Sequence, residues 1–142
     1  MKTFEDLVEF LGTIPYIDEG GCAISALTMY RWLKMNGKRS TIHFFYDPYD
    51  VDYPLNEEYI RGEGIYVFSC QHAMLMYQGK FYDATNEYSR YCKKRHIVPE
   101  KMVVDAINNG YWSPNFNREN IKVIQKFTGV DLSDIKLKRR TQ

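Results

Sequence analysis

Apolar residues recur at helical spacing in a long stretch that begins at Cys22 and ends at Asn36-Gly37. The polar positions in this stretch are few and lie three residues apart, at Ser25, Thr28, Arg31 and Lys34. A narrow polar stripe on an otherwise apolar cylinder is typical of a buried helix. Two glycines, Gly20 and Gly21, come directly before the cysteine. The pattern therefore predicts a central buried helix that carries Cys22 at its N-terminus.

Three further segments have helical patterns, at about residues 3–12, 99–108 and 117–129. Thr3 and Asp6 have the spacing of a capping box at the start of the first segment. A proline opens the second segment, and an asparagine is a suitable cap for the third. A glycine follows the apolar pattern of each, as is common at helix C-termini. We expect three additional helices, two of them near the C-terminus.

Strand patterns occupy the middle of the chain. A short strand is expected at about residues 41–46, and the strongest β signal covers residues 65–77. Gln78-Gly79 is a two-residue hairpin turn, from which the chain returns over residues 80–85. Residues 86–95 are predicted to be a connector. The elements together predict an α+β domain with an antiparallel sheet.

The hairpin turn also predicts which side chains lie together. A two-residue turn fixes the register, so that Met74 opposes Asp83, and His72 lies on the same face as Met74. Diagonal Cβ atoms in such a pair are roughly 7–8 Å apart, a gap that an imidazole and a carboxylate close with a hydrogen bond. We expect this face to pack against the helix that begins at Cys22, because its other members are apolar: Tyr66, Phe68, Met76 and Phe81.

Length and composition are those of an ordinary globular protein. The 142 residues fit one domain, with 44% hydrophobic and 26% charged residues. A net charge of +1 gives no global field, so neither nucleic acid nor a membrane surface is favoured as a partner. We predict a single domain over residues 1–142. It has a core at residues 20–86, a C-terminal helical part at residues 99–129 and a basic tail at residues 130–142.

Cysteine usage indicates the cellular compartment. The three cysteines are an odd number, and the N-terminal residues lack an apolar signal region. This combination is typical of a reducing compartment, so we expect free thiols and a cytoplasmic location. No apolar run approaches the length of about 18 residues that suggests a membrane span, so no membrane partner is expected.

The position of Cys22 gives this thiol a specific chemistry. A cysteine at a helix N-terminus lies among unpaired backbone N–H groups, at the positive end of the helix dipole. That environment favours the thiolate, which is the nucleophilic form of the side chain. With His72 as the base and Asp83 orienting the imidazole, Cys22 completes a Cys-His-Asp triad for attack on a carbonyl. These three are the predicted catalytic residues, and no metal ion or other cofactor is expected.

Two pieces of the chain resemble the papain-like superfamily in its broad sense. They read Gly-Gly-Cys-Ala-Ile-Ser-Ala and His-Ala-Met-Leu-Met-Tyr-Gln-Gly-Lys-Phe-Tyr-Asp-Ala-Thr-Asn. The superfamily includes papain-type and NlpC/P60-type peptidases, transglutaminase-like proteins and arylamine N-acetyltransferases, and the pieces are also similar to small uncharacterised proteins of phages and bacteria. The resemblance covers residues 20–86 and implies a buried N-terminal helix carrying Cys22, packed on an antiparallel sheet. His72 and Asp83 take the places of the family's histidine and acid.

The resemblance implies a thiol hydrolase or acyl transferase that acts on an amide, isopeptide or thioester. The expected partner is a peptide, a protein or a small amide or thioester substrate. Papain-type enzymes have a glutamine a few residues before the cysteine that helps to bind the oxyanion, and this chain has none there. The candidates for oxyanion or substrate binding are instead Tyr16, Glu19 and Gly21.

Three alternatives remain open from the sequence. The chain could be a catalytically silent papain-like binding module, for example a phage-borne inhibitor of a host protein. It could be a small zinc-binding domain, which would use His72 and so exclude the triad; its ligands would be Cys70, His72, Cys92 and His96. Nucleic-acid binding would depend on residues 93–95 and the basic tail, without a motif to support it.

Overall fold

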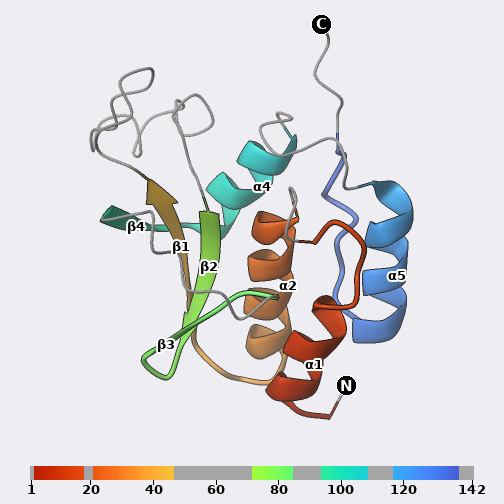
Figure 1. Cartoon of the computed structure of the whole chain (residues 1–142), viewed down its shortest axis with the longest axis horizontal. Helices are drawn as coiled ribbons and strands as arrows, with labels where there is room; N and C mark the ends of the chain where they lie inside the picture. The colour runs from red at the N-terminus through yellow and green to blue at the C-terminus, as the bar shows by residue number, and fades with distance from the viewer. Residues whose placement is uncertain (1, 18–20, 47–71, 85–93, 109–116, 138–142) are drawn as a thin grey trace, which may run out of the picture.

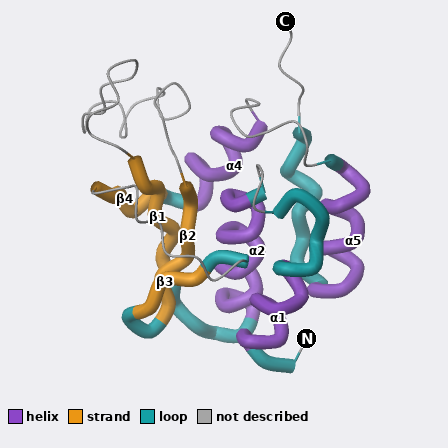
Figure 2. The backbone as a smooth tube through the Cα atoms, viewed as in Figure 1, coloured by secondary structure: helices purple, strands orange, loops and turns teal. Residues whose placement is uncertain are grey.

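A computed structural model of the protein describes residues 2–17, 21–46, 72–84, 94–108 and 117–137. Within these residues the chain is α+β, with four helices and four strands: α1 (Phe4–Leu11), α2 (Cys22–Met35), β1 (Thr41–Tyr46), β2 (His72–Tyr77), β3 (Lys80–Tyr82), β4 (Lys94–Val98), α4 (Glu100–Asn108) and α5 (Arg118–Thr128). The strands form one antiparallel sheet in the order β3-β2-β1-β4. Helix α2 lies between this sheet and α5 (Figure 1, Figure 2).

Helix α2 is the centre of the hydrophobic core. Every residue from Cys22 to Met29 is buried, followed by Trp32 and Leu33. The predicted polar stripe runs along the helix, but its first two members are buried as well, and the Thr28 hydroxyl donates to the Ile24 carbonyl oxygen at 2.7 Å. The sequence prediction of a buried central helix that begins at Cys22 is confirmed.

The ends of α1 and α5 follow their local sequence signals. Thr3 and Asp6 form a capping box, with each side chain bonded to the backbone N–H of the other residue. Asn117 caps α5 by accepting from the Asn120 N–H at 3.1 Å, and Gly129 ends it in the left-handed conformation. The two helices confirm their predicted boundaries to within a residue or two.

The hairpin of β2 and β3 has the predicted turn. Gln78 and Gly79 both have positive φ, at 51° and 76°, which matches the twist of a two-residue hairpin. Tyr77 pairs with Lys80 across the turn, so the predicted register is confirmed. Strand β3 is shorter than expected and ends at Tyr82. Residues 65–71 of the predicted strand and Thr85 lie outside the described residues.

The face of the sheet that packs on the helices differs from the prediction. Ala73 and Leu75 belong to the core cluster that contains α2, together with Ile42, Phe44 and Val98. Met74 alternates with them and is buried outside that cluster. The prediction that the Met74 face covers α2 is therefore wrong. Residues 73–76 are apolar at every position, so periodicity alone could not tell one face from the other.

Strand β4 lies in a region that was predicted in part to be a connector. Residues 94–98 pair antiparallel with β1, which places β4 at an edge of the described sheet. Within this strand Val98 is buried, while Arg95 and Ile97 are exposed. Basic residues are common on edge strands, and their polarity conceals the strand pattern in the sequence.

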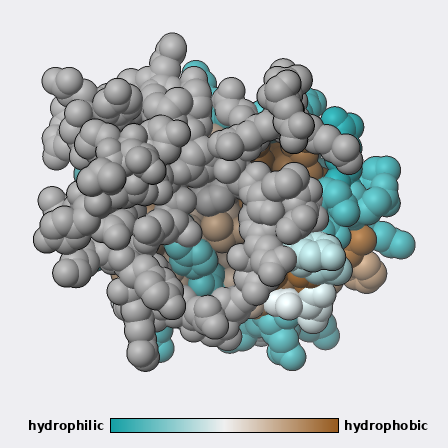
Figure 3. Space-filling model, turned by 45° about the horizontal axis from the view of Figure 1, so that its top comes forward, coloured by the Kyte–Doolittle hydropathy of each residue, from teal (hydrophilic) through white to brown (hydrophobic). Residues whose placement is uncertain are grey.

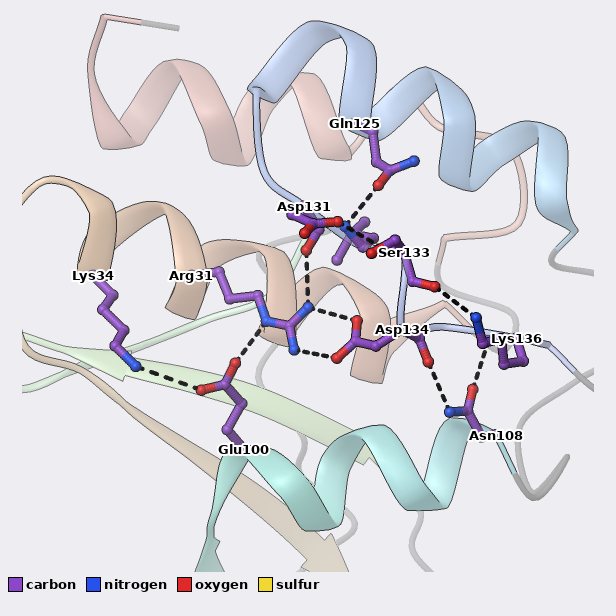
Figure 4. Close-up of polar contacts among 10 residues, drawn as sticks. Arg31, Lys34, Glu100, Asn108, Gln125, Asp131, Ser133, Asp134 and Lys136 are labelled. Atoms are coloured by element: carbon purple, nitrogen blue, oxygen red, sulfur yellow. Dashed lines mark hydrogen bonds and ion pairs between the residues drawn. The ribbon is translucent and has the colours of Figure 1, made fainter.

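Residues 130–137 were predicted to belong to a basic tail, and instead they pack against the helices. Val130, Leu132 and Ile135 are buried in the core cluster. Arg31 of α2 binds both carboxylate oxygens of Asp134, at 2.9 and 2.7 Å, and donates to Glu100 of α4 at 2.6 Å (Figure 4). The segment thus joins α2 to α4. Residues 138–142 lie outside the description.

Five large hydrophobic side chains of the described residues are exposed. Tyr16, Met35 and Ile97 are exposed on different segments, whereas Val123 and Phe127 lie four residues apart on α5. Figure 3 shows small apolar patches among polar residues on one face of the molecule. Among the described helices, none has the length and apolar character needed to span a bilayer.

Candidate active site

The start of α2 leaves backbone donors around Cys22. Gly21 is the buried N-cap residue, and no side chain of the described residues caps the helix there. The first hydrogen bond of the helix runs from Ser25 N–H to the Gly21 carbonyl at 2.8 Å. The N–H groups of Cys22, Ala23 and Ile24 therefore have no acceptor within the helix. The Cys22 side chain lies beside these donors, and the residue is 7% exposed.

His72 and Asp83 form the hydrogen bond that the hairpin register predicts. The Nε2 atom of His72 lies 2.7 Å from Oδ2 of Asp83. A carboxylate oxygen only accepts, so Nε2 carries the hydrogen. The Asp83 side chain is 3% exposed and that of His72 is 22% exposed. The acid is thus inside the protein, while one part of the imidazole reaches solvent.

His72 also hydrogen-bonds to the side chain of Cys22. Because Nε2 is bonded to Asp83, we infer that the thiol meets the ring on the side of Nδ1. Strand β2 begins at His72, and that end of the strand lies beside the N-terminal end of α2 (Figure 1). The three predicted catalytic side chains therefore form one chain of contacts, from Cys22 through His72 to Asp83.

The surroundings of His72 change its protonation. Burial lowers the pKa of His72, but the hydrogen bonds to Asp83 and Cys22 and the charges of these groups outweigh that effect. The result is a pKa raised from 6.5 to about 10. At neutral pH the imidazole therefore keeps both protons and carries a positive charge next to the thiol.

The three candidates for oxyanion or substrate binding have different outcomes. Gly21 lies directly at the site, as the N-cap of α2. Tyr16 is 51% exposed with a φ of 63°, and among the described residues no hydrogen bond joins it to the three catalytic candidates. Glu19 lies outside the described residues. The backbone N–H groups at the start of α2 thus offer hydrogen-bond donors for an oxyanion, a role for which Tyr16 was one predicted candidate.

Two of the four ligands of the alternative zinc site, Cys70 and Cys92, lie outside the described residues. His96 is part of β4, on the far side of β1 from β2. In the described part of the chain, no group of three or more potential ligands could hold a metal ion. Zinc binding through these four residues stays a prediction, as does nucleic-acid binding through residues 93–95, of which Lys93 is also outside the description.

The site brings together a thiol, an imidazole beside it and a carboxylate bonded to the imidazole, which are the groups that nucleophilic catalysis by cysteine requires. Comparison of the chain with protein-family models, with curated proteins and with solved structures found no match. Function is therefore inferred from the three side chains and their surroundings.

Proposed function

We propose that the protein is a thiol hydrolase or acyl transferase that uses Cys22 as nucleophile, His72 as base and Asp83 as the orienting acid, on a papain-like fold. The observation that carries the proposal is that His72 interacts with two of the predicted partners at once: with Asp83 through Nε2, and with the side chain of Cys22, which raises the pKa of the imidazole. A second support is the position of Cys22 at an uncapped helix start. A histidine with a purely structural role in the core does not require both an acid and a thiol as partners.

The proposed reaction begins from an ion pair, in which the proton of the Cys22 thiol is already on Nδ1 of His72 and the ring carries both protons. The sulfur then attacks the carbonyl carbon of an amide, isopeptide or thioester, and the carbonyl oxygen becomes an oxyanion. Backbone N–H groups at the start of α2, including that of Cys22, are suitable donors to this oxyanion. His72 returns its proton to the leaving amine or thiol, which leaves an acyl group on Cys22. Water or an amine then releases the acyl group.

Asp83 has an orienting role in this scheme. Its hydrogen bond to Nε2 fixes the imidazole so that Nδ1 is directed at the sulfur, and its negative charge stabilises the imidazolium. The imidazolium beside Cys22 in turn favours the thiolate. The arrangement keeps the nucleophile activated before substrate binds.

Selective chemical labelling tests the proposal. Iodoacetamide at limiting concentration is expected to label Cys22 before Cys70 and Cys92, as read by peptide mass spectrometry. Incubation with a model acyl thioester should then add one acyl group to the protein. The Cys70→Ser/Cys92→Ser variant should keep both results, and Cys22→Ala should lose both while remaining folded. Equal labelling of all three thiols, or acylation of Cys22→Ala, would contradict the proposal and leave the binding-module alternative.

A further inference from the structure

The hairpin brings Asp83 near His72, but the paired strands do not extend to Asp83. The β2–β3 ladder ends with the pair Leu75 and Tyr82, and Asp83 follows directly after it. Its carboxylate nevertheless lies 2.7 Å from Nε2 of His72 and is almost completely buried. Contacts outside the ladder must therefore hold this residue. The two residues that flank Asp83 in the chain both contact α1 or its C-terminal cap.

On one side of Asp83, Tyr82 packs against the first residue of α1. The ring centroids of Phe4 and Tyr82 are 4.9 Å apart, with an edge-to-face angle of 84°. Phe4 makes a second edge-to-face contact with Tyr77 of β2, at 5.2 Å. One aromatic ring of α1 thus contacts both strands of the hairpin that carries His72 and precedes Asp83.

On the other side of Asp83, the carbonyl oxygen of Ala84 lies against Gly12, the C-cap residue of α1. A Cβ atom at residue 12 would come within 2.7 Å of that oxygen, which is closer than real Cβ atoms approach. Gly12 has φ of −64° and ψ of −17°, a conformation that any residue adopts. The absence of a side chain at this position is therefore required by the Ala84 backbone, and not by the shape of the α1 terminus.

We propose that α1 positions Asp83 for its contact with His72, and that Gly12 and Phe4 are the positioning residues. Gly12 lets the Ala84 backbone lie against the end of α1, and Phe4 holds Tyr82. Between these two contacts the Asp83 carboxylate has one direction, toward Nε2 of His72. The inference rests on the proposed function, because it assigns α1 the task of orienting the group that orients the base.

Substitution of Gly12 by alanine tests the inference. The new methyl group separates Ala84 from α1, and the adjacent Asp83 moves with it. The groups that face His72 among the described residues are Asp83 and Cys22, so a weaker Asp83 contact should lower the pKa of His72. We expect a fall of at least about one unit in an NMR titration of the imidazole, a tenfold change in its proton affinity.

Two control variants separate positioning from a general loss of stability. Leu132→Ala removes a buried side chain from the C-terminal segment and should lower the melting temperature without moving the His72 titration. Glu9→Ala changes an exposed position of α1 and should alter neither. If Gly12→Ala does not fold, Phe4→Leu replaces it, with the same expected fall in the pKa of His72.

The outcomes distinguish this inference from the proposed function. A His72 titration that is unchanged in folded Gly12→Ala, or in Phe4→Leu where the first variant does not fold, overturns the role of α1. A shift of equal size in Leu132→Ala also overturns it, because the effect would then follow stability alone. Failure of Cys22 to label selectively in the unaltered protein would contradict the proposed function, while the NMR comparison would still test the positioning by α1.

Discussion

His72 and His43 lie on neighbouring strands of one sheet and have opposite protonation. In the β1–β2 ladder His43 pairs with Met74, and His72 pairs with Phe45, two positions along the same strands. His43 is 4% exposed, and burial together with the charge of Arg95 lowers its pKa to about 4. Burial acts in the same direction on His72, yet its pKa is about 10. The two imidazoles therefore have different charges at neutral pH.

The difference comes from the partners of each ring. His43 has the Thr41 hydroxyl 2.8 Å from Nε2 and the edge-to-face ring of Phe81 at 5.2 Å, neither of which supplies negative charge. His72 has an acid on one nitrogen and a thiol as its other partner. Burial alone thus makes a neutral core histidine, and an adjacent acid converts a similar site into one suited to acid–base chemistry.

Removing the acid should have the largest effect on this comparison. In Asp83→Asn the negative charge and one of the two accepting oxygens are lost, so the pKa of His72 should fall by several units, toward the value of His43. Any acyl-transfer activity should fall by roughly 1000-fold or more, as expected when a triad loses its orienting acid. NMR titration of the imidazole measures the first effect, and the rate of acylation by the model thioester measures the second. Glu5→Gln, at an exposed site, is the matched charge control. An unchanged His72 titration would show that Asp83 does not determine its protonation.

The two histidines should also give opposite slopes to stability against pH. The pKa of folded His72 lies above 6.5, so its contribution is complete below pH 6.5 and is lost as the pH rises toward 10. The pKa of folded His43 lies below 6.5, so its contribution is present above pH 6.5 and is lost as the pH falls toward 4. The plot of unfolding free energy against pH should therefore have an alkaline limb from His72 and an acid limb from His43. Each limb has a slope of at most about 1.4 kcal/mol per pH unit.

Urea unfolding between pH 4 and pH 10 measures these limbs. The His72→Gln variant should flatten the alkaline limb and leave the acid limb in place. An alkaline limb that is equally steep in this variant would assign it to other groups, and would count against the raised pKa of His72.

Replacement of His43 should have the smallest effect. His43→Phe keeps an aromatic ring against Phe81 and deprives the Thr41 hydroxyl of its partner, which should cost about 1 kcal/mol. The acid limb of the stability profile should become flatter, and the rate of Cys22 labelling should not change. A large loss of labelling in this folded variant would mean that both histidines take part in the chemistry, and the comparison above would fail.

Features that depend on residues close in sequence could be predicted. The capping box of Thr3, the asparagine cap of α5 and the start of α2 at Cys22 each require only a few adjacent residues. The contact between His72 and Asp83 could be predicted too, although eleven positions separate them, because a two-residue turn fixes the register of everything near it.

Features that depend on contacts between distant parts of the chain could not be predicted. The sheet face that covers α2 was wrong because both faces of residues 73–76 are apolar. Strand β4 is defined by its pairing with β1, and residues 130–137 by their packing and by Arg31. The fit of Gly12 against Ala84 joins two segments that have no common pattern. In each case the structure of one segment depends on residues that are distant in the sequence.

The contacts of Arg31 have a consequence for how the protein is made. Arg31 binds Asp131 and Asp134, which follow it by 100 and 103 residues. Ribosomes add roughly 5–20 residues per second, so α2 exists for roughly 5–20 s before these partners are synthesised. During that interval the apolar surface that residues 130–137 later cover has no native partner from that segment. The helix that carries Cys22 is thus synthesised well before the segment that completes its packing.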